Sequence, residues 1–271
     1  MNKKTVLLVI GLIFKVTLFA SQVDTIQVYS QSMNKNIETL VLSPTTNQGT
    51  PTPVLYLLHG FGNNAFGWVE VKPNLQELAE KYNITIVCSD AMNSWYWDSP
   101  RVDDSKYETF FSDELYRFIG SNYNVLTGRK NTAVAGLSMG GHGALWLASK
   151  YPSLYGAAGS MSGGVDLREF GGSWNLSEHL GTYSADNSLW SDYTVAANLE
   201  RLASAKLALI IDCGLDDFFY NVNIELHSQL NKIKVPHDFI IRPGAHNRAY
   251  WNNAIEYQLL FFHQYFNSAD Q

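Results

Sequence analysis

The sequence predicts an α/β fold in which about eight strands form a mostly parallel sheet with helices on both faces. Short apolar runs alternate with helical patterns along the chain, which is typical of strand–helix–strand units. Most of these runs are continuously apolar, as expected for strands buried on both faces. With 271 residues, 46% hydrophobic and 16% charged, the chain is long enough for one large domain with a substantial core. No repeat or Pro/Gly-rich linker divides residues 21–271, so we expect a single domain there.

The first two predicted strands differ from the rest because apolar and polar residues alternate along them. A polar turn at Asn34–Asn36 joins Thr25–Ser30 to Ile37–Leu42, which predicts an antiparallel pair at the sheet edge. The later predicted strands are Val54–Leu58, Ile84–Cys88, Thr132–Gly136, Ala157–Met161, Leu207–Asp212 and Asp238–Arg242.

Helical patterns separate these strands. We predict helices at Leu75–Tyr82, Tyr107–Tyr123, Gly140–Tyr151, Asn221–Lys232 and Arg248–Phe266. The stretch 163–202 has no clear periodicity and is rich in Gly, Ser, Asn and aromatic residues. A loop insertion of this length often shapes a binding site.

Residues 1–20 have the layout of a secretory signal peptide. Lys3 and Lys4 precede an apolar run, and Ala20 offers a small residue for cleavage. We therefore expect an exported protein, periplasmic or extracellular, without a stable membrane anchor, because the run is too short for a span. Cleavage would remove three lysines and no acid, taking the net charge from −6 to −9. An acidic chain is not expected to bind nucleic acid. The sequence does not specify an oligomeric state.

Export would permit a disulfide between the two cysteines, Cys88 and Cys213. Both lie at the ends of predicted core strands that are not expected to be neighbours. We therefore favour two buried free thiols.

The pentapeptide Gly136–Gly140 reads G-x-S-x-G and lies between a predicted strand and a predicted helix. A sharp strand-to-helix turn needs small residues around the central serine and exposes its hydroxyl. This context predicts an α/β-hydrolase fold with Ser138 as a nucleophile.

A serine nucleophile needs a base, and the base needs a carboxylate that orients it. In this fold the acid and the histidine follow the serine, each after a late strand. Among seven histidines, His246 alone lies directly after the last predicted strand and before the last helix. For the acid we favour Asp217 over its neighbour Asp216, which shares the loop after the penultimate strand.

Two backbone amides are expected to stabilise the oxyanion: Met139, which follows the nucleophile, and Phe61, in the loop after the third strand. We interpret His59 as support for that loop and His142 as support for the turn at Ser138. No metal or cofactor is expected.

In combination, these residues resemble the putative-esterase (esterase D-like) family over residues 22–267. The motifs are Leu57–Gly62 with Trp68, Asn93–Tyr96 with Asp98–Pro100, Tyr107–Thr109, Asp113–Leu115, Gly136–Gly141, Gly214–Asp217 and His246 with Trp251. The resemblance implies a triad at Ser138, Asp217 and His246, with Phe61 at the first oxyanion donor. The family includes feruloyl and acetyl esterases of plant cell walls, tributyrin esterases, S-formylglutathione hydrolases and mycolyltransferases.

Aromatic residues in the loops suggest a bulky or carbohydrate-borne ester, because such rings stack on sugars and phenolic groups. The predicted substrate-binding residues are Trp95, Trp97, Trp174, Trp190 and Trp251. The function predicted from the sequence is an exported serine esterase that cleaves feruloyl or acetyl esters on plant cell-wall polysaccharide. The alternatives are an acyltransferase to a sugar hydroxyl, a general short-chain esterase and a non-catalytic carbohydrate-binding protein.

Overall fold

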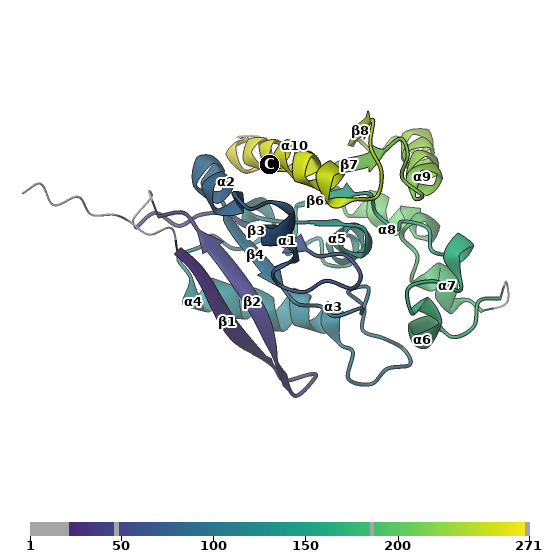
Figure 1. Cartoon of the computed structure of the whole chain (residues 1–271), viewed down its shortest axis with the longest axis horizontal. Helices are drawn as coiled ribbons and strands as arrows, with labels where there is room; N and C mark the ends of the chain where they lie inside the picture. The colour runs from purple at the N-terminus through teal and green to yellow at the C-terminus, as the bar shows by residue number, and fades with distance from the viewer. Residues whose placement is uncertain (1–21, 46–48, 185–186, 269–271) are drawn as a thin grey trace, which may run out of the picture.

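The computed structural model describes residues 22–45, 49–184 and 187–268. The predicted signal peptide lies outside these residues. An eight-stranded sheet with the order β1-β2-β4-β3-β5-β6-β7-β8 forms the centre of the fold (Figure 1). Its strands are β1 (Gln22–Ser30), β2 (Lys35–Ser43), β3 (Val54–Leu58), β4 (Thr85–Ser89), β5 (Thr132–Leu137), β6 (Ala157–Met161), β7 (Ala208–Gly214) and β8 (Asp238–Arg242).

The β1–β2 and β2–β4 pairs are antiparallel, and all other neighbours are parallel. The predicted antiparallel edge pair and the mostly parallel sheet are therefore confirmed. The order also places three strands, β3, β5 and β6, between Cys88 on β4 and Cys213 on β7. Both cysteines are free and buried, as favoured from the sequence.

Helices cover both faces of the sheet (Figure 1). One apolar cluster lies beneath α1, α2 and α10 and includes Trp68, Leu75 and Ile255. A second lies beneath α4, α5 and α8. The α-helices are α1 (Gly67–Val71), α2 (Leu75–Tyr82), α3 (Tyr107–Thr109), α4 (Leu115–Asn122), α5 (Met139–Lys150), α6 (Leu176–Leu180), α7 (Leu189–Asp192), α8 (Leu199–Ser204), α9 (Tyr220–Lys232) and α10 (Arg248–Asn267).

Two regions depart from the predicted helices. The helix expected over 107–123 is interrupted by a π-helical turn at Phe110–Glu114, between α3 and α4. The insertion 163–202 is not a bare loop: it contains α6, α7 and the start of α8, with 3₁₀ turns at Arg168–Phe170 and Val195–Ala197. Helices of four to six residues are too short to show the periodicity on which the prediction depends.

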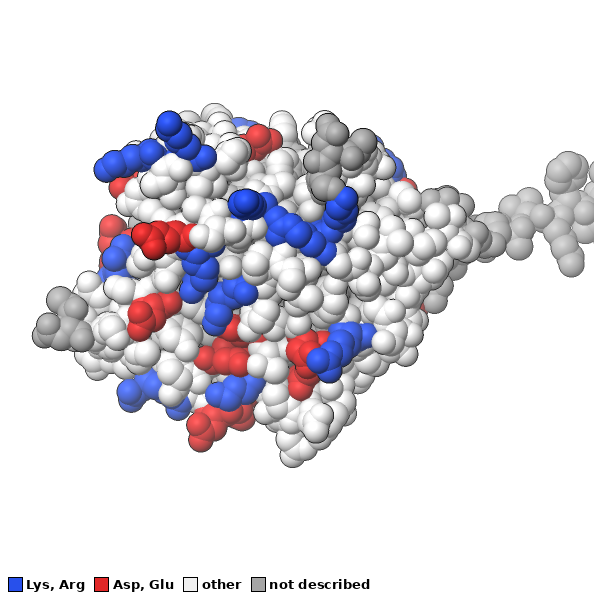
Figure 2. Space-filling view, turned by 180° about the vertical axis from the view of Figure 1, so that it is seen from behind, with Lys and Arg blue, Asp and Glu red and all other residues white. Residues whose placement is uncertain are grey.

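The face opposite to that of Figure 1 carries Lys and Arg side chains interspersed with Asp and Glu (Figure 2). Arg117 and Asp113 form an exposed ion pair at 2.5 Å, whereas Lys150 pairs at 2.6 Å with Glu108, which is buried. None of the helices in the described ranges is long and apolar enough to cross a membrane.

Candidate active site

Ser138 lies at the sharp turn between β5 and α5. Its backbone is in the left-handed region, with φ 55° and ψ −117°, which is strained for a residue with a side chain. A Cβ on Gly136 would lie 2.4 Å from the backbone of Gly140, and one on Gly140 would lie 2.4 Å from the Leu58 carbonyl oxygen. Glycine at these positions therefore allows β5, α5 and the end of β3 to meet closely behind the serine.

His246 lies in the loop between β8 and α10, and its Nε2 is 2.9 Å from the Ser138 hydroxyl oxygen. Its other nitrogen, Nδ1, is 2.9 and 3.0 Å from the two carboxylate oxygens of Asp217. The carboxylate can only accept, so Nδ1 donates to it and Nε2 is left to accept from the serine hydroxyl. The structure thus brings the three predicted residues together. His246 lies between the other two, where it can accept the serine proton while Asp217 orients its ring.

The two candidate acids differ in their surroundings. Asp217 is buried, and its Oδ1 also accepts a 2.8 Å hydrogen bond from the amide of Phe219. Asp216 is exposed, and its amide donates to the Gly244 carbonyl at 2.8 Å. Of the two acids, only Asp217 contacts the imidazole, in agreement with the preference drawn from the sequence.

The loop that contains Phe61 passes beside the nucleophile. A Cβ on Gly60 would lie 3.4 Å from the Cβ of Ser138. Within the described residues, neither the Phe61 nor the Met139 amide donates to another backbone carbonyl. Buried or half-buried amides normally have partners, so two free donors beside a nucleophile fit an oxyanion site.

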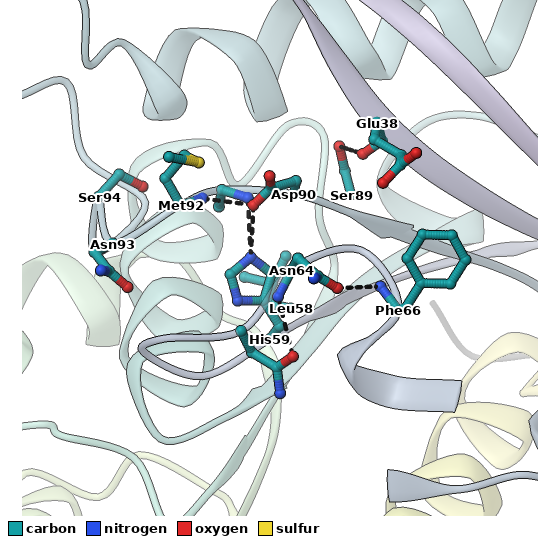
Figure 3. A network of polar contacts seen from close by, with 12 residues as sticks. Glu38, Leu58, His59, Asn64, Phe66, Ser89, Asp90, Met92, Asn93 and Ser94 are labelled. Carbon is teal, nitrogen blue, oxygen red and sulfur yellow. Dashed lines mark hydrogen bonds and ion pairs between the residues drawn. The ribbon is translucent and has the colours of Figure 1, made fainter. Parts of the chain in front are cut away.

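His59 holds the Phe61 loop in place through hydrogen bonds at both of its ring nitrogens; its surroundings are shown in Figure 3. Its Nδ1 donates to the Gly60 carbonyl at 2.8 Å, and its Nε2 accepts from the Ala91 amide at 2.9 Å. Asp90 lies 3.4 Å from the same Nε2 (Figure 3). The loop after β3 is thus fixed by the loop after β4.

A second histidine, His142, supports the opposite side of the turn. Its Nδ1 donates to the Gly164 carbonyl at 3.0 Å, and its Nε2 accepts from the Trp97 indole at 3.2 Å. Burial lowers the pKa of His142 to about 3, so the ring is neutral at physiological pH. It fixes the loop after β6 relative to α5, which agrees with the supporting role expected for it.

Three of the five tryptophans predicted to bind substrate are buried. Trp95, Trp97 and Trp190 are at most 1% exposed, so the prediction that these rings face a ligand is wrong. Each indole N–H has a partner inside the protein, as buried tryptophans require: Trp95 donates to the Trp174 carbonyl, Trp97 to His142 and Trp190 to the Gly181 carbonyl. They stabilise the loops rather than offer a surface.

The other two tryptophans remain partly exposed near the imidazole. The Trp251 ring meets His246 edge-on, with 4.9 Å between ring centroids. Trp174 stacks on Phe218 at 5.6 Å, and Phe218 lies 4.1 Å from the His246 ring. Phe218 is 51% exposed and was not predicted as a site residue. Its position next to Asp217 in sequence is the signal that would have found it.

Comparisons with known proteins agree with this geometry. A family model described as putative esterase matches residues 30–262. An acetyl esterase of Caldicellulosiruptor saccharolyticus is 26% identical over 251 residues, which are 85% of this chain and 94% of that protein. A mycolyltransferase, Ag85B of Mycobacterium leprae, is 30% identical, but the match covers 51% of this chain and 43% of that protein. A solved ferulic acid esterase superposes with a TM-score of 0.77 at 28% identity, over 91% of this chain and 99% of that one.

The match to the family model covers well over half of the chain. The serine, histidine and acid lie together in loops at one edge of a mostly parallel sheet that helices cover on both faces. The chain belongs to the putative-esterase family and is an α/β serine hydrolase that cleaves carboxylic esters.

Proposed function

We propose that this esterase removes acetyl or feruloyl groups from plant cell-wall polysaccharide through an acyl-enzyme on Ser138. The observation that carries the choice of substrate is the group of partly exposed aromatic rings beside His246, formed by Phe218, Trp174 and Trp251. Such rings suit a sugar or a phenolic group better than a small, fully soluble ester. The acetyl esterase relative and the ferulic acid esterase structure support the same substrate class.

In the proposed mechanism the Ser138 hydroxyl attacks the ester carbonyl while His246 Nε2 accepts its proton. Asp217 holds the imidazole with Nδ1 protonated and stabilises the positive charge that forms on the ring. His246 then donates this proton to the departing alcohol oxygen. A water molecule, deprotonated by the same nitrogen, releases the acid from Ser138.

The amides of Phe61 and Met139 stabilise the negative charge on the carbonyl oxygen in the tetrahedral intermediate. Because the His59 bonds fix the Phe61 loop before substrate binds, the Phe61 amide needs no reorganisation during the reaction. A donor of this kind typically contributes ~10²–10³ in turnover.

The proposal includes export, based on the pattern of residues 1–20: two lysines, an apolar run and a small residue at the expected cleavage site. Export would place the enzyme with an extracellular or periplasmic polymer. The substrate is the proposed partner, whether a small soluble ester or an ester on a polysaccharide.

The test is release of free acid from acetylated xylan, methyl ferulate, and 4-nitrophenyl acetate and butyrate. Ser138→Ala is expected to lower turnover by more than ~10⁴-fold. Ser177→Ala, which removes the same atom from an exposed serine on α6, is the matched control and should retain activity. Activity limited to the 4-nitrophenyl esters would reject the cell-wall substrate, and equal turnover by Ser138→Ala would reject the mechanism.

A second candidate is transfer of the acyl group to a sugar hydroxyl instead of water. The observation that favours it is the similarity to the mycolyltransferase over half of the chain. Product analysis with xylobiose present at high concentration separates the two functions. Free acid as the main product would support hydrolysis, and the acylated sugar as the main product would support transfer.

A further inference from the structure

Three rings lie in successive contact at the active site: Trp174, Phe218 and the imidazole of His246. The planes of Trp174 and Phe218 are 20° apart, and those of Phe218 and His246 are 34° apart. We refer to Trp174 and Phe218 as the aromatic row. Phe218 is half exposed and Trp174 is partly exposed, so the aromatic row forms a solvent-accessible surface next to His246.

Buried residues hold the aromatic row in place. Phe219 is 1% exposed and contacts both rings, with centroids 4.6 Å from Phe218 and 5.2 Å from Trp174. The Trp95 indole donates to the Trp174 carbonyl at 3.2 Å. Trp174 and Asn175 both have left-handed backbones, with φ 49° and 56°. Such strain persists only where the surrounding structure enforces it, and it is concentrated at functional sites.

The chemistry of the reaction decides which part of the ester lies near this row. The carbonyl oxygen must be near the amides of Phe61 and Met139. The alcohol oxygen must be within hydrogen-bond distance of His246 Nε2, because that nitrogen protonates it as it leaves. The alcohol portion of the ester therefore lies on the histidine side of Ser138, where the aromatic row begins.

We propose that Phe218 and Trp174 bind the alcohol portion of the ester, and that this portion is a sugar ring. The flat apolar face of a pyranose or furanose fits against aromatic rings, whereas a methyl or ethyl group is too small to reach from His246 to Trp174. This inference rests on the proposed function, since it assigns one part of the polysaccharide ester to one surface of that site.

The proposal predicts that the row acts in only one half of the reaction. Contacts with the alcohol contribute to formation of the acyl-enzyme. Once the alcohol has left, esters of one acid give the same acyl-enzyme, and its hydrolysis no longer depends on the row. A surface for the acyl group would instead affect both esters of that acid alike.

The experiment compares two esters of the same acid, methyl ferulate and 5-O-feruloyl-arabinose, by kcat/KM. Trp174→Ala and Phe218→Ala are each expected to lower the ratio of sugar ester to methyl ester by about 3- to 10-fold, the effect typical of one aromatic contact. Trp174→Phe and Phe218→Tyr should restore most of the ratio. Tyr29→Ala is the matched control, because Tyr29, at 56%, is about as exposed as Phe218 but lies on β1 at the far edge of the sheet.

Phe218 also contacts the catalytic base, so the pH profile of kcat/KM for methyl ferulate is measured for each variant. A lower ratio with an unchanged profile supports the proposal. An equal loss on both esters, or a shifted profile with an unchanged ratio, would overturn it by showing that the row only supports His246 or binds the acyl group. Failure of the wild-type enzyme to cleave both 5-O-feruloyl-arabinose and acetylated xylan would instead reject the proposed function.

Discussion

Asp217 and Asp216 are neighbours in the chain, yet their carboxylates have different surroundings. Asp217 is buried against His246, while Asp216 is exposed and contributes its amide to a turn. The residue type and the loop were predictable from the sequence. The choice between the two depended on a preference, because neither the residue type nor the loop shows which of the two carboxylates faces the imidazole.

Replacing each acid by its amide tests this assignment. Asp217→Asn keeps the shape but favours the wrong imidazole tautomer, so we expect kcat for 4-nitrophenyl acetate to fall by ~10³–10⁴-fold. Asp216→Asn removes the same charge one residue away and should stay within about 2-fold, because this carboxylate is exposed to water and does not contact the imidazole. The assignment is wrong if the two variants lose similar activity.

Burial of the aromatic residues was the least predictable property at this scale. Trp95 and Trp174 both occur in irregular segments, and both were interpreted as ligand surfaces. Only packing distinguishes them: the Trp95 ring is covered by Trp97, His142 and Trp174. Because aromatic side chains serve both core and binding sites, sequence composition does not separate the two roles.

At the scale of elements, the turn between β5 and α5 leaves no room for a side chain at Gly136 or Gly140. Gly136→Ala would place a Cβ 2.4 Å from the carbonyl group of Gly140, where only backbone can move. We expect a loss of ~1–3 kcal/mol or more in the free energy of unfolding, as for overpacked cores. Gly172→Ala, where no atom lies within 4 Å of the added Cβ, should stay within ~0.5 kcal/mol.

Urea unfolding of the two glycine variants and the wild type, followed by circular dichroism, provides the measurement. Equal midpoints for the two variants would show that the turn relaxes around the methyl group and that its close contacts are not required.

The strands were predictable because each has a distinct pattern. The run Val54–Leu58 is continuously apolar and is buried on both faces as β3, with the predicted bounds. The short helices within the insertion 163–202 could not be predicted from such a pattern. Its helices α6 and α7 have five and four residues, and they are stabilised by contacts such as those of Trp190 rather than by a repeating pattern.

At the scale of the whole molecule, His142 links stability to pH. Its pKa is about 3 in the folded state and near 6.5 when exposed, so between these values the unfolded chain binds a proton that the folded chain does not. The free energy of unfolding therefore rises with pH across this window, and the contribution of the neutral His142 is fully present above it. His142 alone should make the fold ~2 kcal/mol less stable at pH 5.0 than at pH 7.5.

His142→Gln, which keeps a donor for the Gly164 carbonyl, should reduce this difference by the same amount in urea unfolding. Between pH 7.5 and 8.5 the variant and the wild type should show parallel behaviour. The same pH dependence in both proteins from 7.5 to 5.0 would mean that the buried imidazole is not the source.

The sheet order follows from the topology of this fold class rather than from any local pattern. Antiparallel pairing of β2 with β4, and the position of β3 between β4 and β5, were not readable from individual runs. The triad was nevertheless predictable, because parallel strands bring their carboxyl ends to one edge and the loops after β5, β7 and β8 meet there.

The separation of Cys88 from Cys213 by three strands has a practical consequence for making this protein. Adjacent strands are about 4.8 Å apart, so the two sulfur atoms are far beyond the reach of a covalent bridge. Folding therefore requires no oxidant, no disulfide isomerase and no particular redox compartment. We therefore expect the chain to fold in a reducing bacterial cytoplasm as well as in a secretory pathway, and thiol reductants to be harmless during purification.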